Sequence, residues 1–192
     1  MFKPEIRILG FDDSPFNSDD KNVAVIGVIY RGGNFLDGIL KTDVDVDGLD
    51  ASEKLIRLIN STRHKQQLKV LMLDGITLGG FNIIDIKQLN EKTHLPVIVI
   101  NRKHPNLKNV EKALKNFKDY KKRWKTILKA GKIKNCSLVN NKKVYYQTIG
   151  LTDEETEEII QLSCTHSQIP EPLRVAHLIA TAIIKGESSG RA

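Results

Sequence analysis

The stretch that decides the fold is VLMLDGITLGGFNIIDIKQLNEKTHLPVIVI, residues 70–100. It opens with a short apolar run, Val70–Leu73, which ends at Asp74, and it closes with a second run, Pro96–Ile100. Between the two runs, residues 85–93 have the spacing of an amphipathic helix. A strand, a helix and a second strand in this order predict a parallel pair joined by a crossover, which is the repeating unit of an α/β sheet.

Three apolar segments precede this stretch, and short connections link them. They are Ile6–Gly10, Val23–Tyr30 and Phe35–Val46, and their β-branched residues are typical of strands. Strands joined by short turns pair antiparallel, whereas the later crossovers require parallel pairing. We therefore expect an α/β fold built on a five-stranded mixed central sheet that is flanked by helices.

Helices are predicted from their start signals and their apolar periodicity. Asp50 with Glu53, and Thr152 with Glu155, have the spacing of a capping box. The expected helices cover residues 50–64, 85–93, 106–130, 152–165 and 170–184, and a small extra strand or hairpin is expected at residues 135–139 and 144–149.

The composition is that of one ordinary globular domain. The chain has 192 residues, of which 40% are hydrophobic and 28% charged. We predict a single domain over residues 1–186 and a flexible tail at residues 187–192. The two cysteines, Cys136 and Cys164, lack the spacing of a disulfide framework or a zinc site, which favours reduced thiols in the cytoplasm. The sequence has no apolar run of about 18 residues, which argues against a membrane span.

Three aspartates lie where predicted strands end: Asp12, Asp47 and Asp74. Strand ends are where α/β sheets build sites, because the loops there are free of ladder constraints. Gathered carboxylates repel one another unless a cation joins them, and the hard cations Mg²⁺ and Mn²⁺ prefer oxygen ligands. We therefore predict that these three aspartates are metal ligands and catalytic residues. The alternative is that each acid only forms a turn, since Asp47 precedes Gly48 and Asp74 precedes Gly75.

The net charge of +7 is concentrated in one segment. Between Arg102 and Lys134 there are 13 Lys and Arg residues against two acidic residues, whereas the rest of the chain has a net charge of −4. A localised basic surface predicts a nucleic-acid partner, and the alternative is a solvated, lysine-rich helix face. Phe117, Tyr120 and Trp124 share one face of this segment, and we interpret them as docking the helix rather than stacking on bases. The residues assigned to nucleic-acid binding are Arg102, Lys103, Lys121, Lys122, Arg123 and Lys125.

Four phrases of the sequence resemble endonuclease V, in the same order along the chain. They are GFDD (10–13), LDG (73–75), PVIVINRK (96–103) and IPEPLRVAHLIA (169–180). The match is closer still to a largely archaeal family of unknown function that is distantly related to that enzyme. The pattern covers nearly the whole chain, and the phrase PEP-x-R-x-A-H is its most specific part.

The resemblance implies a ribonuclease H-like fold with the first strand at the centre of the sheet. Endonuclease V is a metal-dependent nuclease of deaminated nucleic acids, and its catalytic aspartates fall on Asp12 and Asp74. Its glutamate falls on Asp47, a shorter acid, for which Asp45 or Asp43 is the alternative. Its histidine falls on His177, and a basic residue after the fifth strand falls on Arg102. His177 would bind metal or transfer a proton, although a histidine in an apolar helix is also typical of a core residue. The PYIP wedge of the enzyme has no counterpart before Asp47, so inosine recognition is not carried over.

The preferred hypothesis is a nuclease that needs Mg²⁺ or Mn²⁺ and acts on the phosphodiesters of DNA or RNA. One alternative is a nucleic-acid-binding module that keeps this fold without efficient catalysis. The other is a non-enzymatic scaffold that binds a small ligand or a protein, in which the acids are structural. Metal binding separates the nuclease from both alternatives.

Overall fold

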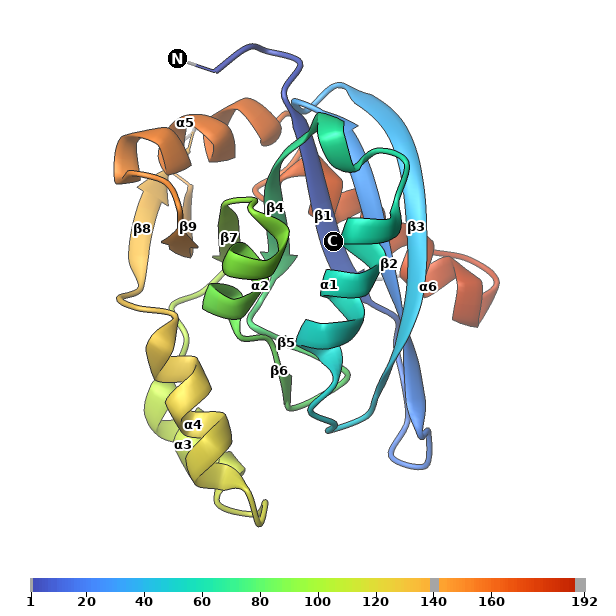
Figure 1. Cartoon of the computed structure of the whole chain (residues 1–192), viewed down its shortest axis with the longest axis vertical. Coiled ribbons are helices and arrows are strands. Elements are labelled where there is room, and N and C mark those ends of the chain that lie inside the picture. Colours follow the sequence, from blue (N-terminus) through green and yellow to red (C-terminus); the bar gives the residue numbers. More distant parts are fainter. Residues whose placement is uncertain (1, 139–141, 189–192) are drawn as a thin grey trace.

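A mixed sheet of seven strands forms the centre of the computed structural model, which describes residues 2–138 and 142–188 (Figure 1). The strand order is β3-β2-β1-β4-β7-β9-β8, so the first strand is central. β1, β2 and β3 pair antiparallel, whereas β1, β4 and β7 pair parallel. The strands are β1 (Arg7–Asp13), β2 (Asn22–Arg31), β3 (Phe35–Asp45), β4 (Leu68–Asp74), β7 (Val97–Asn101), β8 (Lys134–Ser137) and β9 (Lys143–Ile149), with β5 (Thr77–Leu78) and β6 (Asn82–Ile83) in a separate two-stranded sheet.

The predicted α/β class and the mixed sheet are confirmed, but the sheet has seven strands where five were expected. The additional two are the predicted small hairpin, because β9 pairs antiparallel with β7 and extends the main sheet. β8 ends at Ser137, and Val139, at the end of the predicted strand, lies outside the described residues.

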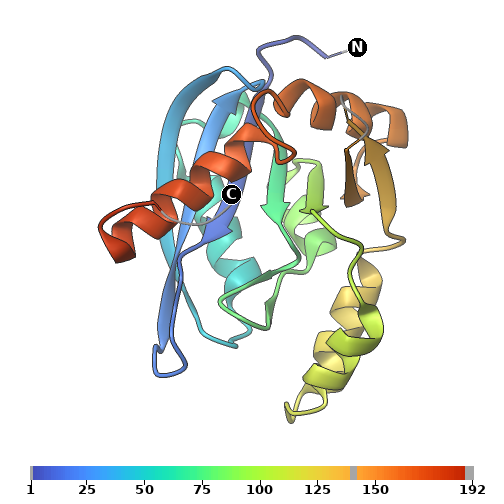
Figure 2. The ribbon, with the colours of Figure 1, turned by 180° about the vertical axis from the view of Figure 1, so that it is seen from behind.

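Helices cover both faces of the sheet. α1 and α2 lie on the face toward the viewer in Figure 1, and α5 and α6 lie on the opposite face, seen from behind in Figure 2. Leu55 of α1 and Leu89 of α2 join one buried core cluster, whereas Ile160 of α5 and Leu173 of α6 join another. The helices are α1 (Ala51–Ser61), α2 (Ile86–Thr93), α3 (Leu107–Leu114), α4 (Tyr120–Lys129), α5 (Asp153–Ser163) and α6 (Glu171–Lys185), with a short 3₁₀ turn, η1 (Lys65–Gln67).

The two predicted capping boxes have different outcomes. The box of Thr152 and Glu155 is confirmed at the start of α5. Asp50 makes no side-chain cap at the start of α1, so the first box is wrong. Its carboxylate instead accepts a hydrogen bond from the Asn82 side chain and pairs with Lys54 at 2.6 Å.

The basic segment is a helical hairpin rather than the single helix expected over residues 106–130. α3 and α4 lie side by side, and they extend away from the sheet past the carboxyl end of β7 (Figures 1 and 2). Leu114 and Ile127 form a small buried cluster with Ile83, and the aromatic side chains of the hairpin pack against it. Those side chains are Phe117, Tyr120 and Trp124, so the docking interpretation is confirmed.

The sequence predicts neither a membrane span nor a disulfide. Among the described residues, there is no helix with the length and apolar character needed to span a bilayer. Cys136 and Cys164 are free thiols.

Candidate active site

Two of the predicted acids meet at the carboxyl ends of neighbouring parallel strands. Phe11 of β1 pairs with Leu73 of β4, so the residues that follow them, Asp12 and Asp74, are neighbours across the strand pair. Asp12 is almost fully buried, and the Asp74 side chain is 21% exposed. The charge of each carboxylate therefore acts on the other within the low-dielectric edge of the sheet.

Helix α6 brings His177 to the same place. Its Nδ1 lies 2.9 Å from Oδ2 of Asp12. This approach depends on Gly10, because a Cβ there would lie 2.8 Å from the carbonyl carbon of Pro172. The start of α6 is fixed by buried Glu171, whose carboxylate accepts two hydrogen bonds from Nε of Arg174 and one from Nη2.

A cavity of about 570 Å³ opens at these residues. Arg102 follows β7 and places Nη2 at 4.0 Å from Oδ2 of Asp74. The cavity therefore combines three acids, a histidine and a guanidinium, which come from β1, β4, the residue after β7, and α6. Its lining residues are Asp12, Asp13, Ser14, Pro15, Phe16, Asp74, Arg102 and His177.

Burial makes the charged forms of these acids costly. Burial, and next the charge of Asp12, raise the pKa of Asp74 to about 6. Burial also raises the pKa of Asp12, against the opposing hydrogen bond from His177. The Asp12 carboxylate in turn raises the pKa of His177. Such shifts are typical of sites where a cation or a proton is expected, although structural ion pairs produce them too.

Asp13 also belongs to the cavity, although it is not among the residues predicted from the sequence. It lines the cavity, and its Oδ2 accepts a hydrogen bond from the backbone N–H of Gly79 at 2.6 Å. Burial raises its pKa, and the charge of Asp74 adds to this effect. Strand periodicity alternates Asp12 and Asp13 between the two faces, so Asp12 contacts α6 while Asp13 contacts the loop after β5. The doubled acid at a strand end was the signal available in the sequence.

The structure does not bring Asp47 to this cavity. β3 ends at Asp45, and Asp47 lies beyond it in a turn with φ of 54°. Its Oδ1 accepts a hydrogen bond from the backbone N–H of Phe81 at 2.7 Å and lies so near the ideal Cβ position of Gly80 that a side chain there would clash with it. The expectation that three acids share one ion fails here, because the acid–valine alternation of β3 does not continue into the turn.

Arg123 requires a correction, since its side chain is only 5% exposed and cannot meet a phosphate. Its guanidinium donates to the carbonyl oxygens of Asp47, Gly48 and Phe81 and to the carboxylate of Asp119. Three other residues assigned to nucleic-acid binding lie on α4 and are exposed: Lys121, Lys122 and Lys125. Lys103, which follows Arg102, is exposed as well.

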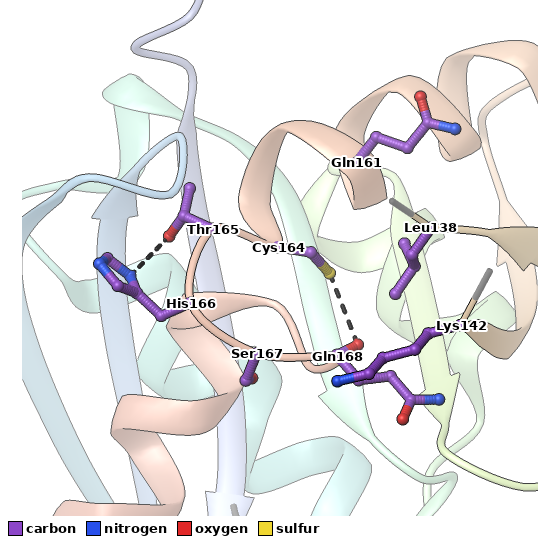
Figure 3. Close-up of a pocket in the computed structure, with 8 residues that line it drawn as sticks. All are labelled: Leu138, Lys142, Gln161, Cys164, Thr165, His166, Ser167 and Gln168. Carbon is purple, nitrogen blue, oxygen red and sulfur yellow. Dashed lines mark hydrogen bonds between the residues drawn. The ribbon is translucent and has the colours of Figure 1, made fainter. Parts of the chain in front are cut away.

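A second cavity, of about 250 Å³, lies by α5 and the loop that follows it (Figure 3). Of the eight described residues that line it, none carries a carboxylate. Cys164 is its one nucleophilic thiol among them, and its Sγ donates to the carbonyl oxygen of Gln168 at 3.6 Å. Burial raises the pKa of this thiol to about 12, so the thiolate is not formed near neutral pH. The chemistry of the acid cavity has no equivalent here.

Relatives of this chain cover it from end to end. A model of the endonuclease dU family matches residues 4–184. The UPF0215 protein of Methanothermobacter thermautotrophicus is 49% identical over 194 residues, which cover 100% of this chain and 94% of that protein. The UPF0215 protein of Methanosarcina mazei is 50% identical over 191 residues, which cover 99% of this chain and 96% of that protein.

Solved structures also resemble this chain. A protein of unknown function from Archaeoglobus fulgidus superposes with a TM-score of 0.85 at 39% identity, covering 94% of this chain and 99% of that one. Endonuclease V of Ciona intestinalis, in complex with a 24mer DNA containing an inosine followed by a ribo-adenosine, superposes with a TM-score of 0.64. Its identity is 14%, with 94% of this chain and 86% of that chain covered, so this likeness shows the fold alone. The chain has the ribonuclease H-like fold of endonuclease V and belongs to the endonuclease dU family.

Proposed function

We propose that this protein is a divalent-metal-dependent endonuclease that cleaves nucleic-acid phosphodiesters at the Asp12–Asp74 pair. The observation that carries the proposal is the meeting of two buried acids, His177 and Arg102 in one open cavity. Burial raises the pKa values of these two carboxylates, and the charge of Asp12 adds to this effect at Asp74, so their ionised forms lower the stability of the folded protein. They are well placed to bind a cation.

The residues fit Mg²⁺ or Mn²⁺ held by two carboxylates. Mg²⁺ is typically bound through one or two carboxylates, with waters and substrate phosphates completing its ligands. Within residues 2–138 and 142–188, no group of three or more Asp, Glu, His or Cys side chains is arranged to hold an ion. We therefore assign the cation to Asp12 and Asp74 alone. Bound there, it would neutralise the two charges and polarise the phosphodiester.

The remaining cavity residues supply positioning and proton transfer. Arg102 faces the cavity from the end of β7, where its planar guanidinium suits a phosphate oxygen pair. The hydrogen bond between Asp12 and Nδ1 of His177 fixes the orientation of the imidazole ring. Nε2 is then free to donate a proton to the leaving oxygen. Asp13 holds the Gly79 loop against the end of β1.

Deoxyuridine in DNA is the lesion we propose as substrate, because the matching family is described as endonuclease dU. Endonuclease V of Ciona intestinalis, which has this fold, was solved in complex with DNA that contains an inosine, and this supports the choice of a DNA substrate. The free cysteines favour a reducing compartment, and we propose the cytoplasm.

The proposal is tested by strand cleavage in Mn²⁺ or Mg²⁺, with labelled DNA that contains one deoxyuridine, one inosine or neither. Cleavage at the deoxyuridine is expected, and Asp12→Asn should reduce it at least about 1,000-fold and remove Mn²⁺ binding in calorimetry. Asp43→Asn, on the exposed side of β3, is the matched control and should retain both. If millimolar Mn²⁺ does not bind and no strand is cut, the proposal fails and the two non-catalytic alternatives remain.

The exposed lysines of α4 are expected to hold the phosphate backbone of the bound nucleic acid. Replacing Lys121, Lys122 and Lys125 with Gln should weaken DNA binding and lower the slope of log affinity against log salt by about 2.7, if each lysine contacts one phosphate. Fluorescence anisotropy at several salt concentrations measures this slope. Lys87→Gln with Lys92→Gln, on the exposed face of α2, is the control. An unchanged slope in the α4 variant would assign these lysines to a merely solvated face.

A further inference from the structure

Phe16 is an exposed aromatic ring in the wall of the acid cavity. It is 37% exposed, whereas Phe11, five residues earlier, is completely buried. Among the eight described residues that line the cavity, it is the one Phe, Tyr or Trp side chain. The hydrophobic effect does not account for a ring left open beside carboxylates, because such a ring is stabilised by burial.

The ring is held in place rather than loose. The chain leaves β1 through buried Ser14, whose backbone N–H donates to the carbonyl oxygen of Ala24 at 2.8 Å. Pro15 follows and restricts the backbone directly before the ring. On its other side the ring reaches the glycine turn after β5, since its Cζ lies 3.7 Å from the ideal Cβ position of Gly80. The ring is therefore supported from behind and open toward the cavity.

We propose that Phe16 is a base-stacking residue, which receives the base of a nucleotide next to the phosphodiester held at Asp12 and Asp74. An aromatic face beside a phosphate-binding centre is the combination with which proteins hold single-stranded nucleic acid. A base inside a duplex already has both faces covered by its neighbours. The bound strand must therefore present an unstacked base at the cavity, and the substrate class is a strand that is single or locally unpaired there.

This inference rests on the proposed function but does not depend on catalysis, so it is tested by binding in Mn²⁺ to strands that contain no deoxyuridine and are not expected to be cut. The probes are a thymidine strand of about 12 nucleotides and a strand of equal length and charge whose sugars carry no bases. The wild-type protein should prefer the thymidine strand by roughly tenfold or more. Phe16→Leu should lose most of this preference while binding the baseless strand unchanged, and Phe16→Trp should keep it.

Phe35→Leu is the matched control, because Phe35 is exposed on the edge strand β3, outside the cavity. It should leave the preference unchanged. Thermal denaturation of both leucine variants reports whether either has lost its fold. If the wild-type protein binds neither strand, the proposed function fails. If it binds both strands and Phe16→Leu retains the full preference for bases, the stacking role is wrong and the proposed function stands.

Discussion

Asp74→Asn is expected to abolish cleavage and, at pH 8, to make the metal-free protein more stable than the wild type. The folded pKa of Asp74 is about 6, above the ordinary value of 3.8. The folded state therefore binds the proton of this carboxyl more tightly than the unfolded state does, and ionisation above pH 6 costs stability. The shift corresponds to a cost of at most about 3 kcal/mol, of which asparagine should recover roughly 1–3 kcal/mol.

The pH dependence gives this prediction its sharpest test. The advantage of the variant should grow as the pH rises from 3.8 to about 6 and be complete above that range, and it should vanish below pH 3.8, where Asp74 is protonated in both states of the wild type. Urea denaturation at several pH values in EDTA measures it. Mn²⁺ should stabilise the wild type at pH 8 and have no such effect on the variant.

Asp37→Asn is the contrasting control, because this aspartate has the opposite pKa shift. Its carboxylate accepts hydrogen bonds from Arg31 and Arg7 at 2.8 and 2.7 Å, which lower its pKa. Replacing it should therefore lower stability at pH 8. A loss of stability in Asp74→Asn at pH 8 would contradict the view that this acid is kept for a cation at the cost of stability.

The part of the site that the sequence predicts is the part that strand geometry fixes. Asp12 and Asp74 each follow an apolar strand, and parallel neighbours end at one edge, so their meeting follows once β1 and β4 adjoin. The strand order does not follow from periodicity, and the central place of β1 is implied only by the family resemblance. His177 came from the resemblance as well, since its position against Asp12 depends on the long-range contact between Gly10 and Pro172.

Other features depend on contacts that no local pattern encodes. Asp47 follows an alternating strand, but the positive φ of its turn directs the carboxylate to the amide of Phe81. The helical pattern of residues 106–130 continues across residues 115–119. A break there lets Phe117 pack edge-on against Phe81, with ring centroids 5.6 Å apart. Arg123 stands among exposed lysines in the sequence, and only the tertiary fold reveals that its side chain is buried.

Arg123→Met is expected to lower the free energy of unfolding by about 3–5 kcal/mol, which makes this arginine more important to the fold than any lysine around it. The buried guanidinium joins α4 to three carbonyl oxygens from two distant loops, with donor–acceptor distances of 2.6 to 3.0 Å. It also pairs with Asp119 and lies over the Phe117 ring at 4.6 Å from its centroid. Methionine fills the space but leaves these buried acceptors without a donor.

Arg123→Lys should recover less than half of the loss, because one ammonium cannot reproduce a planar fork that reaches four acceptors. Arg57→Met is the matched control: Arg57 also pairs with an acid four residues away, but its side chain is 76% exposed, so the change should cost under about 1 kcal/mol. Urea denaturation gives the three values, and hydrogen exchange should show α3 and α4 losing protection before the sheet does. If Arg123→Met and Arg57→Met lose the same small amount, the hairpin is held by its apolar cluster alone. The turn at Asp47 is then not tied to the proposed nucleic-acid-binding face through this arginine.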